Sequence, residues 1–177
     1  MDSEILIWIQ ENIRSEAGDA LMIFVTHTAD PSAIWVLIAL ILMLDKRTRR
    51  AGFLVPVAIA LCRVLNDMVL KEVLGRPRPF LAGTGYLPLV NASGYSMPSG
   101  HASGSFAAAT VMMLYSRKAG AMAILYASLV AFTRLYAFAH YPSDVIAGAV
   151  LGIACAVSVF LIAERICPAE GRAPGGQ

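Results

Sequence analysis

Long apolar runs separated by short polar breaks dominate the chain. Because a helix needs about 20 mostly apolar residues to cross a bilayer, these runs predict membrane helices rather than strands. The nearly continuous runs fall at 51–74, 100–115, 119–138 and 142–163. A further run, 19–44, is interrupted near its middle by the polar stretch HTADPS.

The interrupted run predicts a broken helix rather than one uniform span. Asp30 supplies a carboxylate that can cap a helix, and Pro31 suits the first helical position because its missing amide needs no partner there. We therefore expect a first piece near 18–28, which either spans the membrane or lies in its interface. A second helix should run from about 31 to 45.

The N-terminal segment has apolar residues on one helical face only. A helix over residues 4–15 would place on that face Ile5, Trp8, Ile9 and Ile13. This pattern is typical of an amphipathic helix in the membrane interface, and a frayed tail without packing partners is the alternative. The fold class that follows is all-α, an integral membrane bundle of about five to six helices with an N-terminal interfacial helix.

The composition also indicates a membrane protein. The chain has 177 residues, of which 58% are hydrophobic and 15% charged, and its mean hydropathy is +0.66. Soluble domains are about 45–50% apolar and about 25% charged. We expect one membrane-embedded domain over residues 1–166 and a flexible tail over 167–177, whose composition is typical of disorder. The acids Asp2 and Glu4 are not typical of a secretory signal peptide.

Net charge and cysteine content exclude several classes of protein. A net charge of +2 is too small to indicate a nucleic-acid partner. Cys62, Cys155 and Cys167 do not form a disulfide framework, so we expect buried, reduced thiols. No Cys and His spacing matches a zinc site, and we expect neither a metal nor another cofactor.

The positions of Lys and Arg predict the orientation in the membrane. If five helices cross in turn, the basic breaks 45–50 and 116–118 lie on the same side as Arg165 and Arg172. Positive charge concentrates on the cytoplasmic side of membrane proteins, so we expect that side to be cytoplasmic in a multi-pass cell-membrane protein. The long loop 75–98 then falls on the outer side.

Several polar residues at the outer ends of the helices run against this charge bias. They are Lys71, Arg76, Arg78, Ser99, His101, Arg134, His140 and Asp144. Ionisable groups at membrane depth are costly and usually functional. The cations Lys71, Arg78 and Arg134 come from separate segments and would repel one another at a common point unless an anion lay between them. Arg and Lys donors both suit phosphate oxygens.

The start of the 100–115 helix offers further phosphate donors. In PSGH, residues 98–101, Ser99 and Gly100 stand where free amides and the positive end of the helix dipole point outward. Gly100 also lets the backbone approach a ligand closely. The sequence therefore predicts a helix start that faces a phosphate group.

Two histidines supply groups for phosphoryl transfer. Asp144 follows His140 by four residues and can keep one imidazole nitrogen protonated, which leaves the other as a nucleophile. His140 would attack phosphorus, and His101 would protonate the leaving oxygen and later activate water. Each residue alone also has a structural explanation: a helix cap for His101, an ordinary pair for His140 and Asp144, a headgroup contact for Arg134. Their shared position favours catalysis.

Three stretches carry these residues. They read KEVLGRPRP from Lys71, PSGH at 98–101 and TRLYAFAHYPSD from Thr133 to Asp144. In order and spacing they resemble the three-part signature of the type-2 phosphatidic acid phosphatase family, which shares its site with vanadium haloperoxidases and bacterial acid phosphatases. The similarity covers about residues 51–163. The three motifs together are highly specific, whereas PSGH alone would be weak.

The resemblance implies a metal-free phosphatase acting through a phosphohistidine. It implies His140 as nucleophile, Asp144 as its orienting partner and His101 as general acid and base. The implied phosphate ligands are Lys71, Arg78, Ser99, Gly100 and Arg134. The chain departs from the family at Thr133, where serine is usual. The doubled RPRP leaves Arg76 as a rim contact for a second phosphate.

The resemblance also bears on the substrate. Small bacterial members with an outward site look like undecaprenyl-diphosphate phosphatases, which recycle the cell-wall lipid carrier, so we expect a lipid phosphate as the partner within the bilayer. Phosphatidic acid, phosphatidylglycerol phosphate and a phosphotransferase reaction are the alternatives. A haloperoxidase would be soluble and larger, and a non-catalytic headgroup-binding protein would not need both His140 and Asp144.

Arg63 and Asp67 lie one turn apart in the middle of the 51–74 helix. This spacing predicts an intrahelical ion pair. A contact with the site through Lys71, one turn further along, is the alternative.

Overall fold

The computed structural model describes residues 1–30 and 32–168, and all regular elements in those ranges are helices. In chain order they are α1 (Asp2–Asn12), α2 (Glu16–Thr28), α3 (Ala33–Leu44), α4 (Arg49–Arg63), the π-helix η1 (Val64–Leu70), α5 (Lys71–Leu74), the 3₁₀-helix η2 (Pro79–Leu81), α6 (Gly100–Tyr115), α7 (Arg117–Tyr136) and α8 (Pro142–Ile166). The expected all-α membrane bundle is confirmed. Most of the expected flexible tail, from 169 onward, lies outside the described residues.

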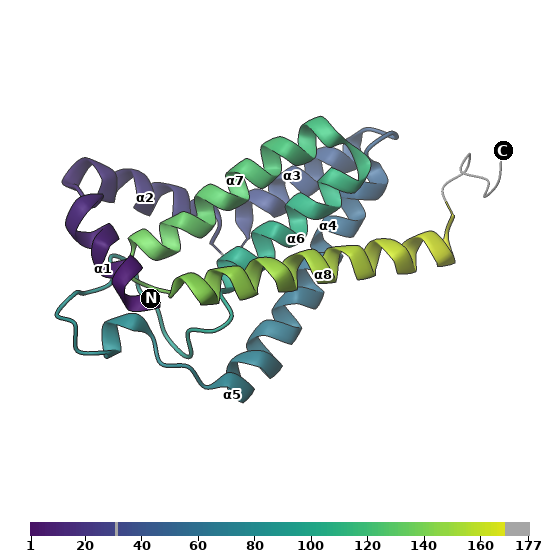
Figure 1. Ribbon diagram of the computed structural model, residues 1–177. Coiled ribbons are helices and arrows are strands. Elements are labelled where there is room, and N and C mark those ends of the chain that lie inside the picture. Colours follow the sequence, from purple (N-terminus) through teal and green to yellow (C-terminus); the bar gives the residue numbers. More distant parts are fainter. Residues whose placement is uncertain (31, 169–177) are drawn as a thin grey trace.

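The long helices form one bundle. Figure 1 shows α3, α6, α7 and α8 running along the long axis and α4 crossing behind α8 toward α5, with α1 and α2 at one end near the loop between α5 and α6. Among the described residues, three helical segments are long and apolar enough to cross a membrane, namely Arg49–Leu81, α7 and α8. The bent pair α2 and α3 makes a fourth if it counts as one span.

The helix α6 is the centre of this bundle, because it packs against α4, α7 and α8. Glycines on α8 allow the close approach. A Cβ atom at Gly152 would lie 2.3 Å from the carbonyl oxygen of Ser103, and one at Gly148 would lie 2.5 Å from that of Ser99. Small residues of this kind let membrane helices pack backbone to backbone. The packing fixes the start of α6, where PSGH lies, against the start of α8.

The N-terminal helix α1 packs against the bundle. Leu6, Ile9 and Gln10 are buried, and the Gln10 side-chain amide donates to the carbonyl oxygen of Tyr136 at 3.0 Å. The alternative of a frayed tail is therefore wrong. Trp8, placed on the same apolar face as Ile9 by sequence, is 54% exposed. The helix buries only part of its apolar surface against protein.

The break between α2 and α3 occurs where the sequence predicts it, but the expected cap does not form. The helix α3 begins at Ala33 after Ser32, while an Asp30 carboxylate oxygen lies 2.5 Å from Nε2 of His101. A carboxylate gains more from an imidazole that can become charged than from a neutral peptide amide. Pro31 lies outside the described residues.

The helix predicted over 51–74 is not uniformly α-helical. Its middle is a π-helix, η1, inserted between Arg63 at the end of α4 and Lys71 at the start of α5. π-Helical turns inside α-helices are rare and frequently occur at functional sites. Hydrophobic periodicity does not distinguish such a turn from an α-helix, which is why the sequence gives no sign of it.

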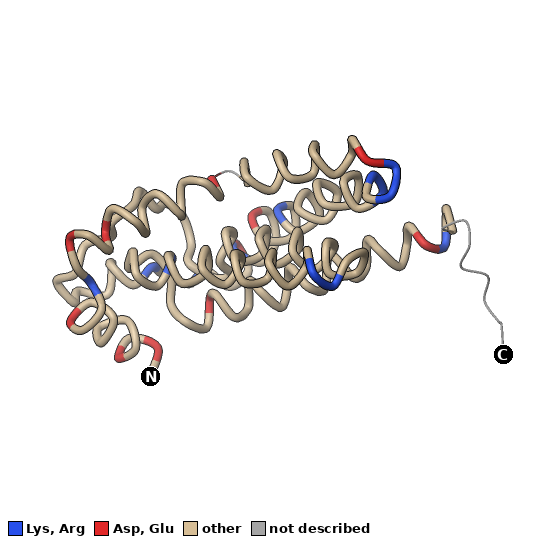
Figure 2. The backbone as a smooth tube through the Cα atoms, turned by 90° about the horizontal axis from the view of Figure 1, so that it is seen from above, with Lys and Arg blue, Asp and Glu red and all other residues tan. Residues whose placement is uncertain are grey.

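The two ends of the bundle differ in charge. Figure 2 shows clusters of Lys and Arg at the end opposite the N-terminus, where the α3–α4 loop and the start of α7 lie. Lys46, Arg47, Arg117 and Lys118 are exposed there. Cys62 and Cys155 are buried as expected, but Cys167 is exposed because it follows the end of α8. The expectation of three buried thiols is wrong for Cys167.

Candidate active site

A polar cavity of about 210 Å³ lies at the end of the bundle that also holds α1 and α2. It is lined by Arg63, Asp67, Lys71, Arg78, Asn91, Ala92, Ser93, Gly100, His101, Arg134 and His140. These residues come from α4, η1, α5, the 75–98 loop, α6, α7 and the turn before α8. The structure therefore brings most of the expected site residues to one place.

The other two expected residues, Ser99 and Asp144, lie directly behind the cavity wall. Both are fully buried. The backbone amide of Ser99 donates to the carbonyl oxygen of Asp144 at 3.0 Å, which ties the start of α6 to the start of α8. The Ser99 hydroxyl has no hydrogen-bond partner within the described chain. A buried polar group without a partner is costly and calls for an explanation.

The surroundings of His140 determine its tautomer. Its Nδ1 lies 2.7 Å from the carbonyl oxygen of Ser96. A carbonyl oxygen can only accept, so Nδ1 carries the hydrogen. The other nitrogen, Nε2, lies 3.3 Å from a guanidinium nitrogen of Arg78, which can only donate. The lone pair of His140 is therefore on Nε2, the nitrogen next to the cationic wall of the cavity.

Asp144 lies behind His140, with its nearer oxygen 3.8 Å from Nδ1. That oxygen accepts hydrogen bonds from the Ser96 hydroxyl at 2.5 Å and from the Tyr141 backbone amide at 2.8 Å. The direct hydrogen bond that the four-residue spacing suggests is therefore replaced by a contact through Ser96. Sequence reasoning missed Ser96, since only the fold brings the 75–98 loop against α8.

Arg76 belongs to this support and not to the cavity rim. Its guanidinium donates to Asp144 at 2.6 Å, to Asp2 of α1 at 2.8 Å and to the hydroxyl of Ser143 at 2.6 Å. It also lies over the ring of Tyr141, 4.1 Å from the centroid. The expectation of a rim contact for a second phosphate is wrong for Arg76, because two carboxylates already neutralise it.

Two arginines of the cavity are buried without a carboxylate partner. Arg78 is 6% exposed and donates to the backbone carbonyl oxygens of Gly94, Ala139 and Ser93 at 3.0, 3.0 and 2.7 Å. Arg134 is 4% exposed and donates to the hydroxyl of Thr26 at 2.7 Å.

These partners orient the guanidinium groups of Arg78 and Arg134 but leave their charges unbalanced. The buried Nε of Arg134 has no hydrogen-bond partner within the described chain. A buried charge without a counterion is costly. An anion in the cavity would satisfy both groups.

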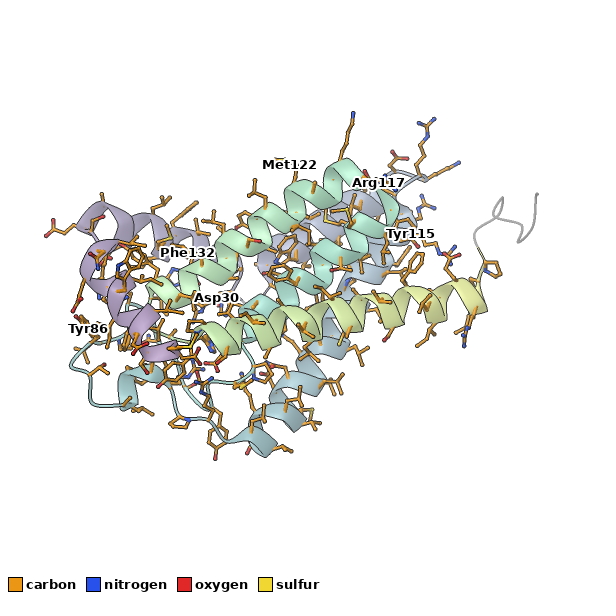
Figure 3. The ribbon with its side chains drawn as sticks, in the orientation of Figure 1. Asp30, Tyr86, Tyr115, Arg117, Met122 and Phe132 are labelled. Carbon is orange, nitrogen blue, oxygen red and sulfur yellow. The ribbon has the colours of Figure 1, made fainter. Side chains whose placement is uncertain are left out.

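Two other lining groups, Lys71 and His101, each have a carboxylate partner. Nζ of Lys71 lies 2.7 Å from an Asp67 oxygen, and Nε2 of His101 lies 2.5 Å from Asp30. The predicted ion pair between Arg63 and Asp67 is not formed, because Asp67 pairs with Lys71 and Arg63 turns to the cavity. In Figure 3 Asp30 lies toward the cavity end, far from Arg117 at the opposite end.

Thr26 and Asp30 were not identified as site residues from the sequence. The polar stretch HTADPS inside an apolar run was the available signal, since Asp30 belongs to it and Thr26 directly precedes it. We interpreted the stretch only as a helix break.

The protonation of His140, in the turn between α7 and α8, also follows from its surroundings. Burial lowers its pKa the most, the nearby Asp144 carboxylate raises it in part, and Arg134 and Arg78 lower it again, to about 4 in all. The imidazole is therefore neutral at physiological pH. Within residues 1–30 and 32–168, no three His, Cys, Asp or Glu side chains gather closely enough to hold a metal ion.

Several curated proteins are similar in sequence. An undecaprenyl-diphosphatase of Sulfolobus acidocaldarius is 34% identical over 136 residues, which is 76% of this chain and 65% of that protein. The undecaprenyl-diphosphatase BcrC of Bacillus subtilis is 27% identical over 150 residues, covering 85% of this chain and 77% of the relative. The chain thus spans slightly less than two thirds of the Sulfolobus relative.

Solved structures share the fold. LpxE of Aquifex aeolicus matches with a TM-score of 0.79 and 26% identity, over 90% of this chain and 94% of the other. A PAP2-type phosphatidylglycerolphosphate phosphatase of Bacillus subtilis matches with a TM-score of 0.72 and 25% identity, over 95% and 85%. These matches support a phosphatase-type hydrolase.

A family model, described as the PAP2 superfamily, matches residues 51–166. This range contains all three motifs that suggested the resemblance, and the resemblance is therefore confirmed. The chain belongs to the PAP2 superfamily.

Proposed function

We propose that the protein is an integral membrane lipid phosphatase that removes the terminal phosphate of a lipid diphosphate through a phosphohistidine on His140. One observation carries the proposal: the cations Lys71, Arg78 and Arg134 line the same cavity as the neutral imidazole of His140. The cations would hold an anionic phosphate against the nucleophile without a metal ion.

The cavity offers several donors for the phosphate oxygens. The arginine forks of Arg78 and Arg134 provide charge-assisted hydrogen bonds, and the unpartnered Ser99 hydroxyl and Arg134 Nε would both be satisfied by the ligand. The first amides of α6, at Gly100 and His101, lack intrahelical acceptors and lie at the positive end of the helix dipole. These donors would stabilise the charge that develops on phosphorus-bound oxygens.

In the first step, the Nε2 lone pair of His140 attacks phosphorus, and the bond between phosphorus and the lipid-side oxygen breaks. His101, which enters this step as the imidazolium, donates its proton to that oxygen and becomes neutral. Asp144, acting through Ser96, and the Ser96 carbonyl keep the Nδ1 hydrogen in place while the imidazole becomes positively charged. Proton transfer by a positioned imidazole contributes about 10²–10⁴ in rate.

In the second step, His101 takes a proton from a water molecule, and the resulting hydroxide attacks phosphorus. The bond between phosphorus and Nε2 breaks, inorganic phosphate leaves and His140 returns to its neutral tautomer. The hydrogen bond between His101 and Asp30 supports the alternate gain and loss of this proton.

Undecaprenyl diphosphate is the first choice of substrate. Two relatives with substantial coverage are named undecaprenyl-diphosphatases. The basic loops lie at the end opposite the cavity, and the positive-inside rule would then place the cavity on the outer face of the membrane. Phosphatidylglycerol phosphate is the second candidate, since the phosphatidylglycerolphosphate phosphatase of Bacillus subtilis shares the fold over 95% of this chain.

The test is phosphate release by the purified protein from undecaprenyl diphosphate, phosphatidic acid and phosphatidylglycerol phosphate in detergent, with and without excess EDTA. We expect the highest kcat/KM with undecaprenyl diphosphate and unchanged rates in EDTA, because arginine and lysine provide the positive charge. Absence of phosphate release from all three lipids would contradict the proposal. A strict requirement for an added divalent metal would contradict the cation-only mechanism.

A further inference from the structure

One cation of the cavity wall has no role in the mechanism described above. Arg63 lines the cavity but lies outside the three motifs. Its side chain is exposed, and no hydrogen bond or ion pair connects it to any described residue. It ends α4 directly before the π-helix η1, near the middle of the helical segment Arg49–Leu81. An unpaired arginine at that depth is costly and indicates a functional contact.

The obvious structural partner of Arg63 is already engaged. Asp67, one turn further along, accepts from Nζ of Lys71 at 2.7 Å and from the side-chain amide of Asn66 at 3.1 Å. Lys71 is thereby partly neutralised, whereas Arg63 keeps its full charge. The pairing leaves a free guanidinium facing the cavity.

The charge of the cavity exceeds what one phosphate needs. Four cations, Arg63, Lys71, Arg78 and Arg134, and the carboxylate of Asp67 give the lining a net charge of +3, before the proton that His101 carries as general acid is counted. A single phosphate monoester carries about −1.5 to −2 at pH 7. A second phosphoryl group adds at least one more negative charge and would bring the ligand close to the charge of the cavity.

The position of Arg63 fits the lipid side of such a ligand. Arg63 precedes Lys71 by eight residues in the same helical segment, Arg49–Leu81, so it lies further from the end that meets the 75–98 loop and nearer the middle of that membrane-length segment. A lipid diphosphate with its terminal phosphate at His140 has its second phosphate nearer the lipid chain, and therefore nearer Arg63.

We infer that Arg63 is a specificity residue that binds the second, lipid-linked phosphate of a diphosphate substrate. The inference rests on the proposed function of the same site, and it names the group that separates diphosphate from monophosphate substrates. The planar guanidinium can bind two oxygens of that phosphate at once. A monophosphate lipid would leave Arg63 without a ligand and would gain nothing from it.

The test compares two lipids that differ by one phosphoryl group, diacylglycerol diphosphate and phosphatidic acid with identical acyl chains. We expect Arg63→Met to lower kcat/KM for the diphosphate by about 10- to 100-fold, the usual weight of a charge-assisted contact. The value for the monophosphate should change less than twofold. Both lipids are measured on one preparation, so loss of folded protein affects both rates equally and leaves their ratio unchanged.

Two variants serve as controls. Arg63→Lys keeps the charge but loses the fork, and we expect an intermediate ratio. Arg117→Met removes an exposed cation at the opposite end of the bundle and should leave both rates unchanged. If phosphatidic acid is not turned over, inhibition constants of the matching lipid bisphosphonate and monophosphonate give the same comparison.

The outcomes separate this inference from the proposed function. An unchanged ratio in Arg63→Met, or equal losses on both lipids, would overturn the role of Arg63 while phosphatase activity stands. Wild-type protein that hydrolyses monophosphates but no diphosphate would also overturn it. Wild-type protein inert on both lipids and on undecaprenyl diphosphate would remove the proposed function and the inference together.

Discussion

The two ends of the helical bundle carry the same residue types in opposite settings. At the basic end, Lys46, Arg47, Arg117 and Lys118 are exposed in loops and helix starts. At the cavity end, Arg78 and Arg134 are almost completely buried, and neutral oxygens hold them in place. The exposed cations need no ligand because water solvates them. The buried cations are left with charge that only an anion can balance.

A second contrast lies within the cavity end itself. Arg76 and Arg78 are separated by one residue, yet Arg76 pairs with two carboxylates and Arg78 with three carbonyl oxygens. Both carboxylates, Asp2 and Asp144, therefore bind Arg76, and this contact holds Asp144 in place. The arginine beside His140 has only neutral groups as partners among the described residues, so no carboxylate balances its charge. Partner type, more than residue type, separates a supporting cation from a binding one.

The largest expected effect comes from removing the nucleophile. His140→Ala should lower phosphate release from a lipid diphosphate by about 10³-fold or more, since the proposed covalent intermediate forms on this imidazole. Initial rates of purified wild type and variant in detergent measure this. Near wild-type activity in the variant would exclude His140 as the nucleophile.

The comparison between the two ends is sharpened by matched arginine substitutions. Arg134→Met should lower kcat/KM by about 10²–10³-fold, as expected for a donor that stabilises developing charge. Arg117→Met should change it less than twofold. Similar losses in both variants would show that the arginines act through the general stability of the bundle.

The comparison between Arg76 and Arg78 predicts a smaller effect on kcat/KM. Arg76→Met should lower kcat by about tenfold and leave KM nearly unchanged, because Arg76 positions Asp144 and does not touch substrate. Asp2→Asn removes one of the two carboxylate partners of Arg76, and it should lower kcat less than Arg76→Met does. A rise in KM without a change in kcat would indicate instead that Arg76 binds substrate.

The smallest expected change is in the dependence of activity on pH. The depressed pKa of His140, about 4, means that the imidazole is neutral above that value and becomes protonated only below it. Protonation of His140 should therefore cause no loss of activity between pH 8 and pH 5.5. ¹⁵N NMR of histidine-labelled protein, assigned with a His140→Gln variant, measures this directly. Protonation of His140 near its ordinary pKa of about 6.5 would refute the buried neutral tautomer.

The sequence predicted the helices and the motif residues of the cavity because both leave local signals. Apolar runs mark the spans, and Lys71, Arg78, His101 and His140 stand out as ionisable residues at helix ends. Their convergence follows once α6 packs on α7 and α8.

The supporting residues were not predictable in the same way. Ser96, Thr26 and Asp30 are ordinary polar residues whose importance depends on which helix lies next to them. The role of Arg76 likewise depends on Asp2, at 74 residues' distance in sequence. The π-helix η1, which separates Arg63 from Lys71, has no sequence pattern of its own.

The most direct test of the account is the stereochemical course at phosphorus. A lipid diphosphate whose terminal thiophosphate carries ¹⁶O and ¹⁸O in a known configuration would be hydrolysed by the purified protein in H₂¹⁷O, and the configuration of the released ¹⁶O,¹⁷O,¹⁸O-thiophosphate would be determined. Attack by His140 followed by attack of water comprises two inversions, so the account predicts net retention. Net inversion would show that water attacks phosphorus directly, and it would contradict a covalent intermediate on His140.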